Sequence, residues 1–286
     1  MNTARRPRIA LVTFGDGGIQ YHAAARRLCR EARESARFSE VQLHSWSSLN
    51  TAFTTKHRQH VLRHPRGFGL WIWKPEVVKL SLLSSGCDRV VYLDAGSTIN
   101  LNPASLPAWR AVVDEAMSTP ILAFEMSHHL ECAWTKVAVF ETLSAPKNVT
   151  QTPQRIGGYA FFDRSAESLG LIDEWQRLCE ANEYQLLLDP GTDSDESLLL
   201  RHRHDQSLFS CLTKLGGYPA LEDETWHEDW SSSRAQSAPI WTPRHCYGTR
   251  FVGHRKKSLH VRAIEIAQRG LTKYVQSANI YRRIRY

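Results

Sequence analysis

A chain of 286 residues with 42% hydrophobic content can bury a full core, and none of its apolar runs reaches the about 20 residues of a membrane span. The net charge of +7 comes from the C-terminal segment, because residues 254–286 hold nine Lys or Arg and one acid. The rest of the chain is close to neutral, unlike a chain coated in positive charge for nucleic acid, so we expect no nucleic-acid partner.

The cysteines and the N-terminus indicate the compartment. The six cysteines are scattered without a Cys-x-x-Cys pair, which is typical of reduced thiols rather than of a disulfide framework or a zinc ribbon. Residues 1–8 lack the apolar segment of a signal peptide. We therefore expect a cytoplasmic protein.

The first predicted elements are a strand, a glycine-rich turn and a helix. Ile9–Phe14 is an apolar strand, Gly15–Gly18 is a loop, and Val41–His44 is a second strand. A strand, turn and helix of this kind can cradle a phosphate or a nucleotide, although the turn is not a full G-x-G-x-x-G and many α/β proteins begin in this way. The helix between the strands is predicted from apolar residues three or four positions apart: Tyr21, Ala24, Leu28 and Ala32.

Arg66–Pro75 contains two Gly, two Trp, one Lys and one Pro. Pro75 is suited to the first turn of the helix that follows. For Trp71 and Trp73 the simpler interpretation is an aromatic anchor that packs this helix on the sheet. Lys74 is a poor core residue between aromatic neighbours, and at a helix N-terminus it is well placed to meet an anion.

Asp94 follows a short apolar strand, Val90–Leu93, and precedes Gly96 and Ser97. An acid at this position lies at the carboxyl edge of the sheet, where open α/β sheets bind their ligands. The simpler interpretation is an Asp that caps a turn. Because the helix after Lys74 leads directly into this strand, we expect Lys74 and Asp94 to face one pocket.

Further elements follow in order: a helix from Pro103, a strand at 120–124, a Gly157–Gly158 turn into a strand, and a helix at 171–179. A cluster of His128, His129, Glu131 and Cys132 could bind a metal, but adjacent histidines rarely point the same way.

Residues 202–207, His-Arg-His-Asp-Gln-Ser, form a second unusual cluster, in which Asp205 and Gln206 open a helix. N-capping by Asp205 is its common role but does not account for the polar residues packed beside it. A zinc-hydrolase site is the alternative, and the sequence lacks the further ligands that it needs.

Together these segments resemble the nucleotide-sugar-binding GT-A fold of glycosyltransferases, whose Tyr-Leu-Asp-x-Asp motif is matched here by Tyr92–Gly96. The segments at 67–75, 94–97, 157–162 and 203–207 also resemble a group of bacterial and viral glycosyltransferase-like proteins. The resemblance implies an α/β fold with a mixed, mostly parallel central sheet flanked by helices. We expect a catalytic domain at 1–253 and a basic helical tail at 254–286.

A more distant likeness to glycogenin-like and lipooligosaccharide galactosyltransferases implies that Asp205 and Gln206 lie near the anomeric carbon and that His254 is a late metal ligand. The second Asp of the motif is Gly96 here. Either Asp94 and His254 still hold Mn²⁺ or Mg²⁺, or no metal is needed and basic residues neutralise the leaving diphosphate. Those basic residues would be Lys74, Arg255 and Lys256.

The resemblance therefore implies a hexosyltransferase of polysaccharide or glycoconjugate synthesis, which moves a sugar from a nucleoside diphosphate to a glycan or lipid-linked acceptor hydroxyl. It leaves open whether the transfer retains or inverts the configuration. The expected catalytic residues are Asp205 and Gln206. The expected donor-binding residues are Phe14, Gly15, Asp16, Trp73, Lys74, Asp94, Ala95, Gly96, Ser97, Gly157, Gly158, Arg255 and Lys256.

The competing hypothesis is a non-catalytic protein that binds a nucleotide sugar, a membrane or nucleic acid, in which Gly96 marks a degenerate site. The apolar face of the predicted tail either packs on the domain or lies on an anionic membrane. The second arrangement would place the protein peripherally at the inner membrane face, which suits a lipid-linked acceptor. That face consists of Ile264, Leu271, Tyr274, Val275 and Ala278.

Overall fold

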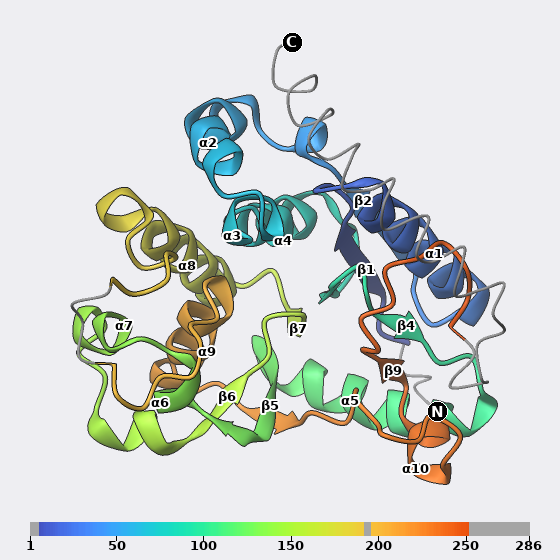
Figure 1. The fold of residues 1–286 in the computed structure, drawn as a ribbon. Helices are drawn as coiled ribbons and strands as arrows, with labels where there is room; N and C mark the ends of the chain where they lie inside the picture. The colour runs from blue at the N-terminus through green and yellow to red at the C-terminus, as the bar shows by residue number, and fades with distance from the viewer. Residues whose placement is uncertain (1–5, 192–195, 252–286) are drawn as a thin grey trace, which may run out of the picture.

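The computed structural model describes residues 6–191 and 196–251, and a seven-stranded sheet forms the centre of this part of the chain (Figure 1). The strand order is β2-β1-β3-β7-β5-β6, and β8 pairs with β5. Strands β2, β1, β3, β5 and β8 run in one direction, whereas β6 and β7 run in the other. The expected mixed, mostly parallel sheet is confirmed. The strand bounds are β1 Ile9–Phe14, β2 Glu40–His44, β3 Arg89–Leu93, β5 Ile121–Leu130, β6 Pro153–Arg155, β7 Tyr159–Phe162 and β8 Ala220–Glu222.

Helices connect and cover these strands (Figure 1), and the described part contains no helix long and apolar enough to cross a membrane. The longer helices are α1 Ile19–Ser35, α2 Thr51–Arg63, α4 Lys74–Ser84, α5 Leu106–Ser118, α8 Ala166–Tyr184 and α9 Asp205–Leu215. The short ones are η1 Trp46–Ser48, α3 Gly67–Leu70, η2 Pro103–Ser105, α6 Glu131–Trp134, α7 Val137–Thr142, η3 Lys147–Gln151 and α10 Ser233–Ser237.

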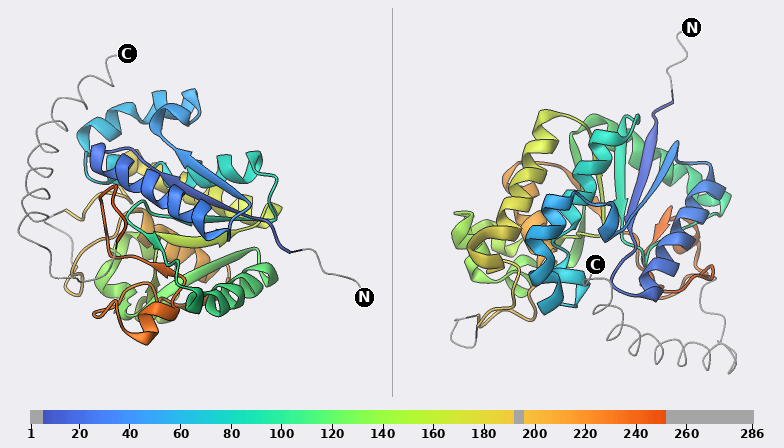
Figure 2. Two further views of the ribbon diagram at one scale, coloured as in Figure 1. Left: turned by 90° about the vertical axis from the view of Figure 1, so that its right-hand side faces the viewer. Right: turned by 90° about the horizontal axis from the view of Figure 1, so that it is seen from above.

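The sheet separates two hydrophobic cores, because successive side chains of a strand point to opposite faces. In β3, Val90 and Tyr92 belong to the core that also contains residues of α4, α8 and α9, whereas Val91 and Leu93 belong to the core shared with α1 and α5. Helices therefore lie on both sides of the sheet, as the view from above in Figure 2 shows. Asp94 follows Tyr92 by two positions, so the same alternation directs its side chain toward α4 and α9.

Strands β6 and β7 pair with successive parts of β5, since Gln154 lies opposite Met126 and Phe161 opposite Leu122. The backbone N–H of Ile156 still donates to the Phe124 carbonyl of β5 at 2.8 Å, and the pairing is interrupted at Gly157 and Gly158. This interruption leaves the carbonyl groups of Gly157 and Gly158 available to other segments, and both accept hydrogen bonds from the candidate site.

A second sheet returns the end of the described chain to the Asp94 loop. Strand β9 (Ile240–Trp241) pairs antiparallel with β4 (Thr98–Ile99). His245 then donates its backbone N–H to the carbonyl oxygen of Gly96 at 3.1 Å.

The segment before α4 forms a left-handed turn. Positive φ angles occur at five consecutive residues, Gly67 to Trp71, three of which are not glycine. Trp73 supports the turn by donating from its indole nitrogen to the Gly67 carbonyl at 3.0 Å. Backbone strain of this kind costs on the order of 1–3 kcal/mol per residue and is often found at functional sites.

Two predicted elements need correction. The strand expected at 120–124 continues to Leu130, because its second half pairs with β6. The N-cap of α9 is His204, with φ 51° and ψ −122°, and Asp205 is the first helical residue. The predicted tail at 254–286 lies outside the described residues, so its helical character stays a prediction.

Candidate active site

Asp94 lies at the carboxyl end of β3, and its side chain is 45% exposed. Its backbone N–H donates to the Gly158 carbonyl at 3.0 Å, and its own carbonyl accepts from Ser97 at 2.9 Å. The hydroxyl of Tyr92 donates to Asp94 Oδ1 at 2.8 Å. The hydroxyl of Tyr92 therefore fixes one carboxylate oxygen of Asp94, while the Asp94 side chain as a whole remains partly exposed to solvent.

Lys74 is buried, contrary to the expectation that it is a poor core residue, because three acceptors surround its ammonium group. Its Nζ lies 2.8 Å from Asp205 Oδ2, 2.9 Å from the carbonyl oxygen of Gly157 and 3.6 Å from Asp94 Oδ1. The ammonium also lies 5.3 Å from the centre of the Tyr92 ring. Lys74 thus contacts both acids, and that Lys74 and Asp94 face one pocket stays a prediction.

The pKa values of Lys74 and Asp205 are both shifted. Burial alone lowers the pKa of Lys74, but the carboxylates of Asp205 and Asp94 outweigh it, and the net shift is upward. Burial raises the pKa of Asp205 to about 6, although the ammonium of Lys74 opposes this rise. Asp205 is 2% exposed, and the indole nitrogen of Trp175 donates to its backbone carbonyl at 3.1 Å. Asp205 is therefore the buried acid of the site, and Asp94 is the partly exposed one.

Gln206 and Gly157 lie next to these acids and contact each other. The backbone N–H of Gly157 donates to Gln206 Oε1 at 3.1 Å, and Gln206 Nε2 donates to Gln154 Oε1 at 2.7 Å. A Cβ atom on Gly157 would lie 3.0 Å from the Cβ of Gln206. Glycine is needed here for this close approach. The amide of Gln206 therefore has both of its ends oriented by neighbours.

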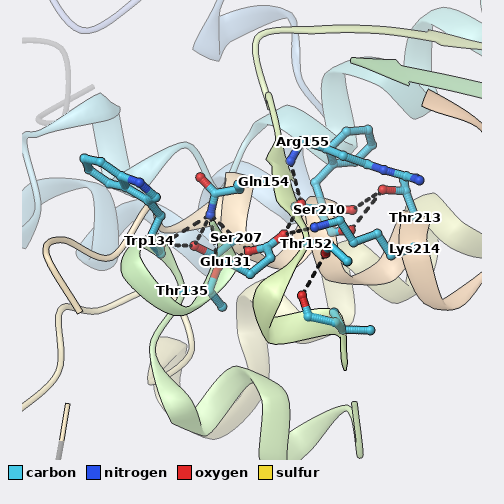
Figure 3. A network of polar contacts seen from close by, with 12 residues as sticks. Glu131, Trp134, Thr135, Thr152, Gln154, Arg155, Ser207, Ser210, Thr213 and Lys214 are labelled. Carbon is cyan, nitrogen blue, oxygen red and sulfur yellow. Dashed lines mark hydrogen bonds and ion pairs between the residues drawn. The ribbon is translucent and has the colours of Figure 1, made fainter. Parts of the chain in front are cut away.

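Gln154, which contacts Gln206, also belongs to a polar network centred on Glu131 (Figure 3). Glu131 is fully buried and lies 2.6 Å from the ammonium of Lys214. It also accepts hydrogen bonds from Thr135, at 2.6 Å, and from Ser210. A buried carboxylate with these partners fixes the position of Gln154 and, through it, of Gln206.

The loop 94–97 is held from inside by Arg27, a residue that the sequence analysis did not select. Arg27 is fully buried and donates to the carbonyl oxygens of Ala95, at 3.0 Å, and Ser97, at 2.8 Å. Ala95 and Ser97 are themselves buried, so their side chains pack inside the protein and support the loop. A Cβ atom on Gly96, the position of the second motif acid, would lie 3.3 Å from the Cα of Arg244, which is a tight contact.

The residues predicted to contact the nucleoside lie at the end of β1. The rings of Phe14 and Trp73 stack with centroids 3.9 Å apart, and they are 3% and 5% exposed. Trp73 is thus the expected aromatic anchor. Asp16 Oδ2 accepts the backbone N–H of Trp46 at 2.5 Å, and Gly15 packs against Leu43 and Ala25. Contact of Phe14, Gly15 and Asp16 with a nucleoside stays a prediction.

The described residues contain no group of three or more His, Cys, Asp or Glu that could hold a metal ion. Asp94 is the one expected metal ligand among them, and the ammonium of Lys74 beside it disfavours a second positive charge. The other expected ligand, His254, lies outside the described residues, as do Arg255 and Lys256. A metal at Asp94 would therefore need ligands from other sources, and the described residues alone do not fit one.

No protein-family model matches the chain, and no curated protein matches it in sequence. Among solved structures, the chain is similar to a glycosyltransferase involved in the glycosylation of the major capsid of PBCV-1. The TM-score is 0.44 at 14% identity, over 85% of this chain and 94% of that chain.

Mouse xyloside xylosyltransferase 1 in its apo form gives a TM-score of 0.40 at 13% identity, over 82% of this chain and 97% of that chain. An active-site mutant of LgtC gives 0.35 at 13% identity, over 92% and 96% of the two chains. Because all three TM-scores lie below 0.5, the site is interpreted below from the residues of this chain.

Proposed function

We propose that the chain is a glycosyltransferase that moves a sugar from a nucleoside diphosphate to a hydroxyl of a glycan or lipid-linked acceptor. The observation that carries the proposal is the contact of Lys74 with both Asp94 and Asp205. Two motifs more than 100 residues apart in sequence, each of which resembles a sugar-nucleotide motif, thereby meet at the carboxyl edge of β3.

Within this site, the partly exposed Asp94 is the residue that would accept hydrogen bonds from the ribose or join a metal shell. The ammonium group of Lys74 pairs with this carboxylate, with Nζ 3.6 Å from Asp94 Oδ1. A direct bond from Lys74 to the diphosphate would require it to give up one of its three present acceptors.

Asp205 is buried, so its proposed role is to orient Lys74 and the start of α9 rather than to reach an acceptor hydroxyl directly. Gln206 is partly exposed and is the member of the pair that would lie beside the anomeric carbon. Proton transfer by Asp205 as a general base would need the site to open first.

The finer assignments are part of the proposal. They are the transfer of a hexose, a role in polysaccharide biosynthesis, Mn²⁺ or Mg²⁺ held by Asp94 together with His254, and peripheral association with the membrane. A metal would supply charge stabilisation for the leaving diphosphate.

Thermal-shift measurements with UDP, GDP and CMP, each with and without Mn²⁺, test the proposal. We expect one nucleotide to raise the melting temperature of the wild type, and the Asp94→Asn variant to lose most of that shift. A dependence of the shift on Mn²⁺ would assign the metal. The absence of a shift with all three nucleotides would contradict the proposal.

Turnover of a donor sugar distinguishes the proposed transferase from a non-catalytic protein that only binds the nucleotide sugar. The non-catalytic alternative predicts that the same nucleotide binds but that no donor sugar is consumed, even with acceptor glycans present. Measurement of nucleotide release over a panel of donor sugars distinguishes the two functions.

A further inference from the structure

Arginine side chains without acidic partners gather beside Gln206. The guanidinium carbon of Arg203 lies 4.1 Å from the centre of the Trp134 ring, and its Nε is buried without a hydrogen-bond partner. Within the described ranges, the guanidinium groups of Arg203 and Arg244 make neither a hydrogen bond nor an ion pair. Stacking on Trp134 explains why Arg203 is half-buried, but it leaves the buried Nε–H donor without an acceptor.

Arg203 and Arg244 approach the same place from two segments of the chain. The backbone carbonyl of Arg203 accepts from Gln206 at 3.1 Å, whereas the Cα of Arg244 packs over Gly96. His129 is near both: its ring is 5.0 Å from that of Trp134, and its pKa is lowered by burial and by the charges of Arg203 and Arg244. Arg203 thus precedes the start of α9 by two residues, and the backbone of Arg244 lies against the loop that follows Asp94.

The electrostatic environment of this cluster is unfavourable in isolation. Burial, together with the positive charges of Arg244, Arg201 and Arg66, lowers the pKa of Arg203 to about 10. Like charges at close range repel, and removing them from water adds to the cost. A bound oxyanion would relieve both effects, because guanidinium groups match its geometry with paired N–H donors.

We propose that Arg203 and Arg244 bind an oxyanion, a phosphate or a carboxylate, carried by the acceptor substrate. This inference rests on the proposed glycosyl transfer. The position favours the acceptor over the donor: the expected nucleoside contacts follow β1, on one side of β3. Arg203 lies on the other side, where Trp134 follows β5 and its carbonyl oxygen accepts the backbone N–H of Arg203 at 3.1 Å. Arg244 lies over Gly96, in the loop that follows β3.

Isothermal titration tests the inference with three probes: inorganic pyrophosphate, glucuronate and neutral glucose. The proteins are the wild type, Arg203→Gln, Arg244→Gln and, as a matched control, Arg110→Gln, which removes an exposed arginine of α5. We expect the wild type and the control to bind one of the two anions but not glucose. Each active-site variant should bind that anion about tenfold or more weakly, as expected for the loss of a charge-assisted hydrogen bond. The preferred anion identifies the group as phosphate or carboxylate.

The titrations are repeated in saturating UDP or GDP, whichever the thermal-shift measurements select. Anion binding that persists in the presence of the nucleotide supports an acceptor site. Displacement by the nucleotide would assign the arginines to the donor diphosphate and overturn the inference. Equal affinities in all four proteins, or no anion binding to the wild type, would also overturn it. Anion binding without any donor turnover would instead reject the proposed transfer while leaving the oxyanion site in place.

Discussion

Lys74 and Asp205 form a buried ion pair in which Nζ and Oδ2 are 2.8 Å apart and each side chain is 3% exposed. Burying two charges costs several kcal/mol per ion, and an apolar pair of similar volume often stabilises a fold as well or better. Such a pair is therefore weak evidence for stability. Because the same ammonium lies 3.6 Å from the half-exposed Asp94, we interpret the pair as a support for the charged face of the site.

Replacement of Lys74 by Met should leave the Asp205 carboxylate buried without a counter-charge. Breaking a buried pair in this way costs about 3–5 kcal/mol, and we expect a loss of this order in the free energy of unfolding at pH 7. Urea unfolding followed by circular dichroism measures it. The double variant Lys74→Met with Asp205→Asn should recover part of the loss, because no charge is then stranded.

The matched control is Lys79→Met, on the same helix. Lys79 pairs with Asp173 at 2.6 Å, but its side chain is 37% exposed, so its loss should cost less than about 1 kcal/mol. Equal losses for Lys74→Met and Lys79→Met would contradict the buried position of Lys74.

The raised pKa of Asp205 predicts a pH dependence of stability. Its pKa rises from an ordinary value of 3.8 to about 6 in the folded protein, so the folded state binds this proton more tightly than the unfolded chain does. The contribution of Asp205 to the free energy of unfolding is therefore greatest below pH 4 and falls as the pH rises toward 6. Asp205→Asn should lack this fall. The difference between wild type and Asp205→Asn, measured by urea unfolding from pH 4 to 7, isolates it from other groups, and a flat difference would refute the assignment.

Gly158 should not tolerate a side chain. A Cβ atom there would lie 2.5 Å from Asp94 Oδ2, which would displace that carboxylate. Gly158→Ala should weaken binding of the nucleotide selected by thermal shift by about tenfold or more. Gly170→Ala is the control, because nothing lies within 4 Å of its Cβ position and the exchange in helix α8 should raise stability by up to about 1 kcal/mol. Unchanged nucleotide affinity in Gly158→Ala would show that Asp94 is not a ligand.

Arg27 should control the shape of the Asp94 loop. Arg27→Gln removes donors from the carbonyl oxygens of Ala95 and Ser97, and it leaves Glu31 buried beside it. We expect a lower melting temperature and weaker nucleotide binding. Arg26→Gln, at the exposed neighbouring position, should change neither. Nucleotide affinity that is equal in both variants would indicate that the loop does not contribute to the site.

The sequence predicted the elements that carry the site because each has a strong local signal. Val90–Leu93 is an uninterrupted apolar strand that ends in an acid, and Pro75 marks the first turn of α4. The proximity of Lys74 and Asp94 followed from chain order alone. The proximity of Asp205 came from the resemblance, because its position depends on how α9 packs across the sheet.

Other features could not be predicted from local patterns. Arg27 looks like one of several polar residues on an amphipathic helix, and only the return of the 94–97 loop makes it a buried donor. The left-handed turn at 67–71 places Phe68, Leu70 and Trp71 at positive φ, which propensities disfavour and tertiary contacts impose. The Arg203 and Arg244 cluster combines residues from separate segments, each of which is unremarkable in sequence.

The measurement that tests the account most directly is nucleotide release from a panel of nucleotide sugars, comparing wild type, Asp94→Asn and the exposed control Asp173→Asn. We predict that the wild type and the control consume one donor at similar rates, and that Asp94→Asn, still folded, is slower by about 100-fold or more. Equal rates in Asp94→Asn and the wild type, or no release from any donor, would contradict the assignment of this edge of the sheet as the active site.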